Sequence, residues 1–139
     1  MIEAPSYTIS FYYRKILVPV DGSESGYKAL LLAVDIASRY GSRVTVAYAK
    51  PRGISEPEDP IIKAKERLKS ISINVSYKYM EYDPLNESPQ MVLLREIIEG
   101  GYDLVIIGAR GKSILGDVNI GSVTLSLVVN APTSIFIVR

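Results

Sequence analysis

The 139-residue sequence contains no cysteine and no histidine. Without cysteine the chain can form neither a disulfide nor a thiolate metal site, which suits a reducing cytosol. Without histidine it lacks the commonest general base, the Ser-His nucleophile pair and the commonest metal ligand. Any chemistry must therefore use carboxylates, lysine, tyrosine, hydroxyls or a metal ion that arrives with a ligand.

Excess charge and long apolar runs are also missing. Sixteen Lys and Arg residues against fifteen Asp and Glu leave a net charge of +1, which gives no electrostatic case for nucleic acid or an anionic membrane as main partner. No window approaches the roughly 18 apolar residues of a membrane span. The N-terminal stretch MIEAPSYTISFYYRK has no signal-peptide pattern. We therefore expect a cytoplasmic protein of one domain that binds neither nucleic acid nor membrane.

Short apolar strands alternate with amphipathic helices along the sequence. The expected strands are residues 15–20, 43–49, 71–79, 103–108 and 134–138. The expected helices are residues 24–40, 60 to about 70, 89–99 and 122 to about 129. Their N-caps are expected to be Ser23 or Ser25, Asp59 and Ser88, with Gly41 ending the first helix. Strict alternation of apolar and polar residues in 71–79 is typical of an edge strand with one wet face.

This order of elements predicts an α/β fold with βαβ crossovers and an open, doubly wound parallel sheet. Ligands of such sheets bind beyond the carboxyl ends of the strands, where the strand order reverses. Two loops follow buried strands at that edge: Asp21-Gly22-Ser23 and the glycine-rich stretch 108–122, GARGKSILGDVNIGS. The sequence therefore places a candidate site between these two loops.

The glycine-rich stretch is not a Walker P-loop, although it contains Gly111-Lys112-Ser113. The Walker pattern G-x-x-x-x-G-K-[ST] requires a glycine where Ile106 stands, and without it the loop cannot form the same backbone nest. What remains is Gly108, Gly111 and then Gly121-Ser122 at the start of a predicted helix. The spacing leaves two interpretations open, an anion site or glycines that only serve turns.

The anion-site interpretation rests on backbone N–H groups at the start of the last helix, where phosphate is favoured. Gly121, Ser122, Val123 and Thr124 would present free N–H groups, and two hydroxyls would add donors. Three or four charge-assisted hydrogen bonds at ~1.5–3 kcal/mol each barely match the ~4–15 kcal/mol lost on association. A ligand held there must therefore also bury a base or a similar apolar group.

The pattern G-x-x-G-x9-G-[ST], with YDLVIIG before it and SVT, NAP and IFIVR after it, resembles the ATP-binding branch of the universal stress protein family (UspA-like domains). The opening RKILVPVDGSESGYKAL is similar to that family's first strand and turn. The resemblance spans residues 14–139 and leaves residues 1–13 as an N-terminal extension. It implies a Rossmann-like five-stranded sheet of order 3-2-1-4-5, similar to adenine nucleotide alpha hydrolases. It also implies bound ATP, with Mg²⁺ or Mn²⁺ on the phosphates, and a homodimer through the C-terminal strand.

The resemblance further implies which residues contact the nucleotide. Those at the adenosine end are Pro19, Val20, Asp21, Ala49, Ile107 and Gly108. Pro19 and Val20 would line the adenine, Asp21 would bond the ribose or the adenine edge, and Ala49 would lie on the adenine. Asp21 could instead be a turn residue that bonds its own backbone.

A second set of residues is implied at the phosphate end. These are Arg110, Gly111, Gly121, Ser122, Val123 and Thr124. Arg110 stands where the family often has histidine, and it could bind phosphate through its forked guanidinium or remain a solvated loop side chain. No protein residue is expected to ligate a metal by itself.

Two departures from the family pattern concern surfaces. The stretch after the second strand is short, so its helix is expected to cover less of the sheet. Leu125 and Val129 stand where the family has charged residues, four positions apart and hence on one helix face. They predict an extra apolar contact, either with the N-terminal segment or between subunits.

Three functions remain open at this stage. The leading hypothesis is an ATP-binding regulatory or stress-response module without catalytic residues, in which slow ATP hydrolysis is not excluded. The alternative is an adenine-nucleotide enzyme that hydrolyses ATP or transfers an adenylyl group. The absence of histidine and of S-G-G weighs against that, because the related enzymes it resembles use H-x-G-H or S-G-G-x-D-S. A third is a family member that acts by dimerisation without nucleotide.

Overall fold

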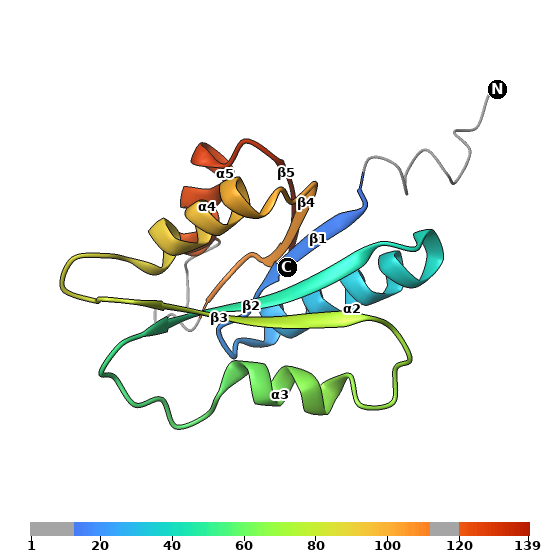
Figure 1. The fold of residues 1–139 in the computed structure, drawn as a ribbon, viewed down its shortest axis with the longest axis horizontal. Coiled ribbons are helices and arrows are strands. Elements are labelled where there is room, and N and C mark those ends of the chain that lie inside the picture. The colour runs from blue at the N-terminus through green and yellow to red at the C-terminus, as the bar shows by residue number, and fades with distance from the viewer. Residues whose placement is uncertain (1–12, 112–119) are drawn as a thin grey trace.

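The computed structural model describes residues 13–111 and 120–139, which form a parallel sheet with helices on both faces (Figure 1). The strands are β1 (Lys15–Pro19), β2 (Arg43–Pro51), β3 (Val75–Tyr82), β4 (Leu104–Gly108) and β5 (Ser134–Val138). The helices are α2 (Glu24–Tyr40), α3 (Pro60–Arg67), α4 (Pro89–Gly100) and α5 (Ser122–Asn130). The predicted N-terminal extension lies outside the described residues except for Tyr13.

The sheet has five strands in the order β3-β2-β1-β4-β5, and every pairing is parallel. The predicted fold class and strand order are therefore confirmed. β1 is central and buried on both faces: Ile16 and Val18 join the core under α2 and α3, whereas Leu17 joins the core under α4 and α5. The strand order reverses beside β1, which pairs with β2 on one side and β4 on the other.

Capping residues fix the helix ends where the sequence predicts them. The Ser23 hydroxyl, rather than that of Ser25, caps α2, and Gly41 ends it with a left-handed φ of 72°. The Asp59 side chain accepts hydrogen bonds from the first N–H groups of α3. Ser88 caps α4 in the same way through Met91 N–H. Each cap satisfies donors that have no carbonyl partner inside the helix.

Several sequence-based details are wrong. Strand β2 runs to Pro51 rather than residue 49, and β3 runs to Tyr82 rather than residue 79. The helical periodicity of the sequence groups Leu31 with Tyr27 and Leu30 on one side of α2, but Leu31 is 48% exposed whereas Tyr27 and Leu30 are buried. Helix α3 ends at Arg67 rather than near residue 70. Strand β3 begins at Val75 rather than at residue 71, because its ladder starts where β2 begins, with Val44 opposite Val75. Alternation alone cannot locate a strand end that a neighbouring strand decides.

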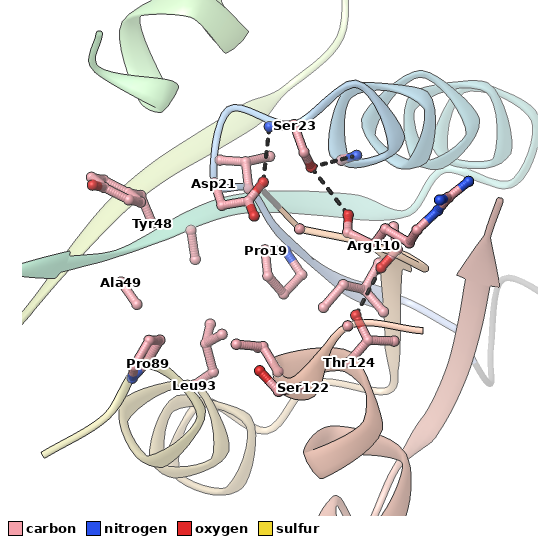
Figure 2. Close-up of a pocket in the computed structure, with 18 of the residues that line it drawn as sticks. Pro19, Asp21, Ser23, Tyr48, Ala49, Pro89, Leu93, Arg110, Ser122 and Thr124 are labelled. Carbon is pink, nitrogen blue, oxygen red and sulfur yellow. Dashed lines mark hydrogen bonds between the residues drawn. The ribbon is translucent and has the colours of Figure 1, made fainter. Parts of the chain in front are cut away.

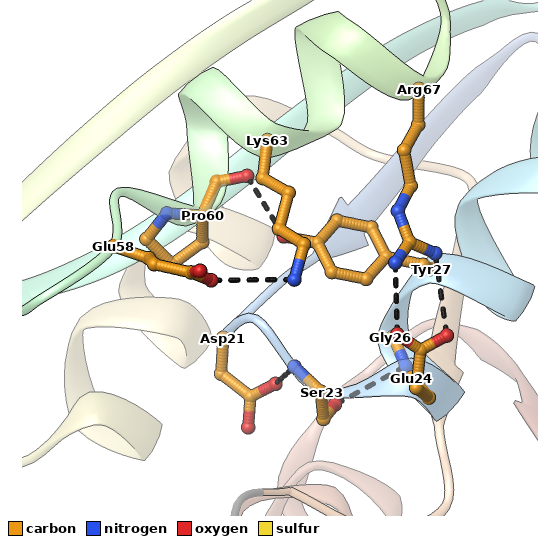
Figure 3. Close-up of polar contacts among 9 residues, drawn as sticks. All are labelled: Asp21, Ser23, Glu24, Gly26, Tyr27, Glu58, Pro60, Lys63 and Arg67. Atoms are coloured by element: carbon orange, nitrogen blue, oxygen red, sulfur yellow. Dashed lines mark hydrogen bonds and ion pairs between the residues drawn. The ribbon is translucent and has the colours of Figure 1, made fainter.

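The short helix α3 is held against α2 through Tyr27 (Figure 3). The buried Tyr27 ring lies between two cations, with the Arg67 guanidinium 4.1 Å and the Lys63 ammonium 5.5 Å from its centroid. Arg67 also donates to both oxygens of Glu24, at 3.3 and 2.8 Å. These contacts fix the start of α2 close to the carboxyl edge of the sheet. Within the described residues, no helix has the length and apolar character needed to cross a membrane.

Candidate functional site

A cavity of about 410 Å³ opens at the carboxyl ends of the strands, where their order reverses. Figure 2 shows Asp21 from the loop after β1, Ala49 from β2, Leu93 from α4 and Ser122 from α5 around it. The volume falls in the range of small-molecule sites, roughly 300–1,000 Å³. The geometry therefore places a small-molecule-sized hollow where the topology of the sheet predicts one.

Every residue that the sequence assigns to the site lines this cavity. They are Pro19, Val20, Asp21, Ala49, Ile107, Gly108, Arg110, Gly111, Gly121, Ser122, Val123 and Thr124. They come from three strands, two loops and one helix, so they meet only in the folded chain. Their roles toward a ligand stay predictions, because lining a cavity shows position and not contact.

Asp21 makes a tight turn after β1. Its Oδ1 accepts a hydrogen bond from the backbone N–H of Ser23 at 2.9 Å, which is the turn role that the sequence left open. The other oxygen, Oδ2, lies toward Gly111, where a Cβ would come within 2.7 Å of it. One carboxylate oxygen thus shapes the turn after β1, while the other lies close to Gly111 of the glycine loop.

The first residues of the glycine loop are hydrogen-bonded to the start of α2 and to β5. The Arg110 carbonyl accepts hydrogen bonds from the hydroxyls of Ser25 at 2.5 Å and Ser23 at 3.4 Å. Ala109 N–H donates to the Val138 carbonyl at 2.7 Å. Because backbone carbonyls accept these bonds, the conformation at Ala109 and Arg110 depends on the start of α2 and on β5. Within residues 13–111 and 120–139, this part of the cavity wall is therefore well anchored.

Gly108 brings β4 and α2 unusually close together. A Cβ on Gly108 would lie 2.6 Å from the backbone carbon of Ser25 and 2.7 Å from the nitrogen of Gly26. Real Cβ atoms do not approach backbone atoms so closely, so only glycine fits without a shift of the chain. The glycine at the end of β4 therefore permits the contact that closes one side of the cavity.

The start of α5 presents backbone N–H groups to the cavity. The first hydrogen bond of the helix runs from Leu125 N–H to the Gly121 carbonyl. The N–H groups of Ser122, Val123 and Thr124 therefore precede the helical ladder. Gly121 is the N-cap and has no side chain to occupy them. This is the arrangement that favours an anion at a helix start.

Two of the donors predicted for a phosphate have partners inside the protein. Gly121 N–H donates to the Ala109 carbonyl at 2.6 Å. The Thr124 hydroxyl donates to the Gly108 carbonyl at 2.8 Å, and Thr124 is only 3% exposed. Both groups hold the glycine loop onto α5 instead of facing the cavity. The donors left at this end are the three N–H groups and the exposed Ser122 hydroxyl.

Arg110 is an exposed residue at the rim of the cavity. In Figure 2 its side chain extends along the start of α2, away from Ala49 and Leu93. The predicted contact of its guanidinium with phosphate stays a prediction. In the part of the chain that the structure describes, no three carboxylates come together as a metal site.

The opposite end of the cavity is built by residues that the sequence analysis missed. Ser23 and Gly26, at the start of α2, also line the cavity, next to the glycine loop. The lining residues at the opposite end are Ala47, Tyr48, Pro51, Glu56, Tyr82, Pro89 and Leu93. Small or apolar side chains predominate, with three polar groups in Tyr48, Glu56 and Tyr82. Burial raises the pKa of Tyr48 to about 12, helped by the nearby Glu56 carboxylate, and the same causes raise the pKa of Tyr82. Both hydroxyls therefore keep their protons at neutral pH.

Comparison with known proteins gives one consistent result. Residues 12–75 and 81–139 match the family described as the universal stress protein family. A universal stress protein from Thermus aquaticus is 26% identical over 136 residues, which cover 91% of this chain and 99% of that protein.

Solved structures share the fold. UspA from Lactobacillus plantarum has a TM-score of 0.74 at 22% identity, covering 92% of this chain and 99% of its own. A universal stress protein from Archaeoglobus fulgidus described in complex with dAMP has a TM-score of 0.70 at 18% identity, covering 92% and 99%. Another universal stress protein, described in complex with cAMP, has a TM-score of 0.69 at 21% identity, covering 92% and 98%.

Proposed function

Because the chain belongs to the universal stress protein family, we propose that it is a regulatory module that binds an adenine nucleotide. The preferred ligand in this proposal is ATP, with Mg²⁺ or Mn²⁺ on its phosphates. The observation that carries it is the cavity that joins the open N–H groups of α5 to an apolar wall at the end of β2. One end suits a phosphate and the other suits a flat, largely apolar base.

At the phosphate end, the N–H groups of Ser122, Val123 and Thr124 hold the phosphates together with the Ser122 hydroxyl. Gly111 lets the glycine loop lie close to Asp21 and to the phosphates, because a Cβ at this position would come within 2.7 Å of Asp21 Oδ2. Arg110 is part of the glycine loop, and its guanidinium can turn toward the phosphate tail and bind it through two N–H groups. The helix dipole adds a partial positive charge at the same place.

At the adenosine end, the base packs between the end of β2 and the start of α4. Ala49 is small and Leu93 is buried, so a flat ring has room to lie between them. Pro19 and Ile107 close the cavity beneath. The Oδ2 atom of Asp21 accepts a hydrogen bond from a ribose hydroxyl. Apolar contact with the base supplies the binding energy that the phosphate donors alone do not.

The structural relatives described with cAMP and dAMP support an adenine nucleotide as the ligand class. At sequence identities of 21% and 18%, these structures support a shared fold but not the individual contacts between this chain and a nucleotide. The preference for ATP comes from the several donors at the start of α5, because a longer phosphate tail uses more of them.

Calorimetric titration of the full chain with ATP, AMP and cAMP, each with Mg²⁺, tests the proposal. We expect saturable binding with ATP the tightest, and no more than slow phosphate release over hours. Rapid turnover would instead assign the chain to the enzyme class. Absence of binding by all three nucleotides would contradict the proposal and favour a module that acts by dimerisation alone.

The proposal includes a homodimer formed through β5. In the described part of the chain β5 is an edge strand, and its sequence SIFIV carries no charge. The other edge strand, β3, carries Lys78 and Glu81, and charged side chains discourage edge-to-edge pairing. Phe136 is 47% exposed on β5. The apolar edge therefore suits pairing with a second copy.

A further inference from the structure

The end of the cavity that lies away from α5 is acidic. Glu56, in the loop between β2 and α3, contributes a carboxylate to the wall there, next to Tyr48 and Tyr82. Among the described residues, the basic side chain in the cavity wall is Arg110, in the glycine loop. Figure 2 shows Tyr48 and Arg110 on opposite sides of the cavity. Asp21 adds a second carboxylate to the wall beside the glycine loop, so the start of α5 differs from the Glu56 end through its N–H donors and the nearby Arg110.

Tyr48 forms the cavity wall next to Glu56. Its ring is only 6% exposed and packs edge-on against Tyr79, with centroids 6.4 Å apart. The Tyr79 hydroxyl is itself tied to Asp59 Oδ2 at 2.6 Å. At the cavity burial raises the pKa of the Tyr48 hydroxyl, and Tyr48 lies close enough to Glu56 for that carboxylate to help raise this pKa. A carboxylate has about four acceptor positions, so Glu56 retains capacity for a ligand donor.

This arrangement determines the orientation of a nucleotide in the cavity, that is, which end holds the base and which holds the phosphates. A phosphate beside Glu56 would meet a like charge, whereas the start of α5 offers N–H donors and a favourable dipole. The base therefore faces Glu56. A carboxylate can only accept hydrogen bonds, so the complementary group on the base is an N–H donor.

We propose that Glu56 selects nucleotides whose base carries an exocyclic amino group, by accepting a hydrogen bond from that group. Tyr48 is the positioning residue that orients the Glu56 carboxylate. This inference rests on the proposed nucleotide site and adds the base selectivity of that site. A base without the amino group leaves the carboxylate facing only ring atoms that cannot donate, which weakens binding.

The test compares ATP with purine riboside triphosphate, which lacks the 6-amino group and is otherwise alike. We expect the wild-type chain to bind ATP about tenfold more tightly, as one hydrogen bond to a charged group implies. In Glu56→Ala this preference falls toward one, because ATP loses affinity while the analogue does not. Tyr48→Phe lowers the preference partway by releasing the carboxylate.

Glu58→Ala is the matched control. Glu58 lies in the same loop but outside the cavity wall, and its carboxylate pairs with Lys63 at 3.3 Å (Figure 3). This variant should keep the wild-type preference for ATP. It separates loss of the Glu56 contact from a general change of charge in the loop.

The possible outcomes separate the two proposals. If both nucleotides bind and Glu56→Ala keeps the wild-type preference, the selectivity role is wrong and the nucleotide site stands. Equal losses for both nucleotides would show a merely structural role and also overturn the selectivity. If neither nucleotide binds the wild-type chain, both proposals fall together.

Discussion

Gly108 ends β4 directly against the start of α2, and a methyl group there would lie 2.4 Å from Ser25 Oγ and 2.6 Å from the Ser25 backbone carbon. We expect Gly108→Ala to lower the free energy of unfolding by about 1–3 kcal/mol, because overpacking forces the backbone apart. The same shift should weaken nucleotide binding. Urea denaturation followed by circular dichroism measures the first effect, and calorimetry measures the second.

Gly53→Ala serves as the comparison for this variant. Gly53 has a φ of 77° and no heavy atom within 4 Å of its added Cβ. Its substitution should cost only the backbone strain of about 1–2 kcal/mol and leave nucleotide binding unchanged. If Gly108→Ala binds nucleotide as well as Gly53→Ala does, the close approach at β4 is not what shapes the site.

Residue by residue, the sequence predicts one half of the site better than the other. The loop glycines and the helix start were found because glycine spacing and a capping position are local signals. The sequence did not predict that Gly121 N–H and the Thr124 hydroxyl bond inside the protein. Their acceptors, the Ala109 and Gly108 carbonyls, are placed only when α5 packs on β4. Nothing in the sequence pointed to Glu56 as a site residue, because an acidic side chain in a loop is usually solvated.

At the level of elements, Asp59 decides where α3 begins. Its Oδ1 accepts from Ile61 N–H at 2.8 Å and from Ile62 N–H at 3.3 Å. We expect Asp59→Ala to lower the free energy of unfolding by about 1 kcal/mol at pH 7, the usual value of an N-cap. Asp59→Asn keeps an oxygen acceptor and should cost less. Urea denaturation of the three proteins at pH 7 gives the comparison.

The contribution of Asp59 should also depend on pH. Burial acts to raise its pKa, but the hydrogen bonds from Tyr79, Ile61 and Ile62 outweigh burial and lower the pKa below its usual value. A carboxyl whose pKa is lowered on folding stabilises the protein above its unfolded pKa, near 3.9, and loses this effect as pH falls through the folded pKa. The stability gap between wild type and Asp59→Ala should therefore be full at pH 7 and shrink below about pH 4. A gap of constant size would contradict the charged-cap account.

Helix α5 offers the sharpest test of the phosphate end. Ser122→Asp places a carboxylate at the first helical position, where the helix dipole tolerates or favours it. We expect the variant to fold with at least wild-type stability and to lose at least about tenfold in ATP affinity, because like charges meet at close range. Titration calorimetry and thermal unfolding on the same samples measure both quantities.

Ser126→Asp is the control for this helix. It adds the same charge one turn further along α5, at a residue outside the cavity wall. ATP affinity should change little in this variant. If both variants bind ATP as the wild type does, the phosphates do not lie at the start of α5.

Element ends show why local patterns succeed or fail. The helices begin where the sequence predicts because Ser23, Asp59 and Ser88 act on N–H groups two or three residues away. The start of β3 was misplaced because Val75 is set by its partner Val44, far away in the sequence. The exposure of Leu31 was not predicted for a related reason. Helical periodicity shows which side of a helix is apolar, but not how much of that side the sheet covers.

Across the whole molecule, the order of strands and helices was enough to predict a doubly wound parallel sheet, and the family resemblance supplied the order of its strands. Alternating strands and helices admit few arrangements, because parallel crossovers are right-handed and neighbouring strands tend to be close in sequence. That topology brings the loops after β1 and β4 to one cavity. Assembly is different, since it depends on surfaces that a single chain leaves open.

The outer face of α5 and the edge of β5 are the surfaces on which assembly depends. Leu125 is 49% and Val129 is 72% exposed, and Phe136 on β5 is 47% exposed. The predicted contact of α5 with the N-terminal segment falls on residues outside the described part of the chain. A subunit interface remains to be tested. A stable dimer needs roughly 1,200–2,000 Å² of total buried surface, so α5 and β5 must act together.

We expect the wild-type chain to sediment as a dimer and the Leu125→Lys/Val129→Lys variant to shift toward monomer. Two ammonium groups in an apolar interface repel their copies and lose hydration, which opposes association. Both side chains are exposed in the single chain, so folding should be retained, as circular dichroism can verify. Leu31→Lys, at a residue 48% exposed on α2, should leave the sedimentation coefficient unchanged. A double variant that still sediments as a dimer would remove α5 from the interface and leave β5 alone to account for assembly. A wild-type monomer at micromolar concentration would contradict the proposed dimer altogether.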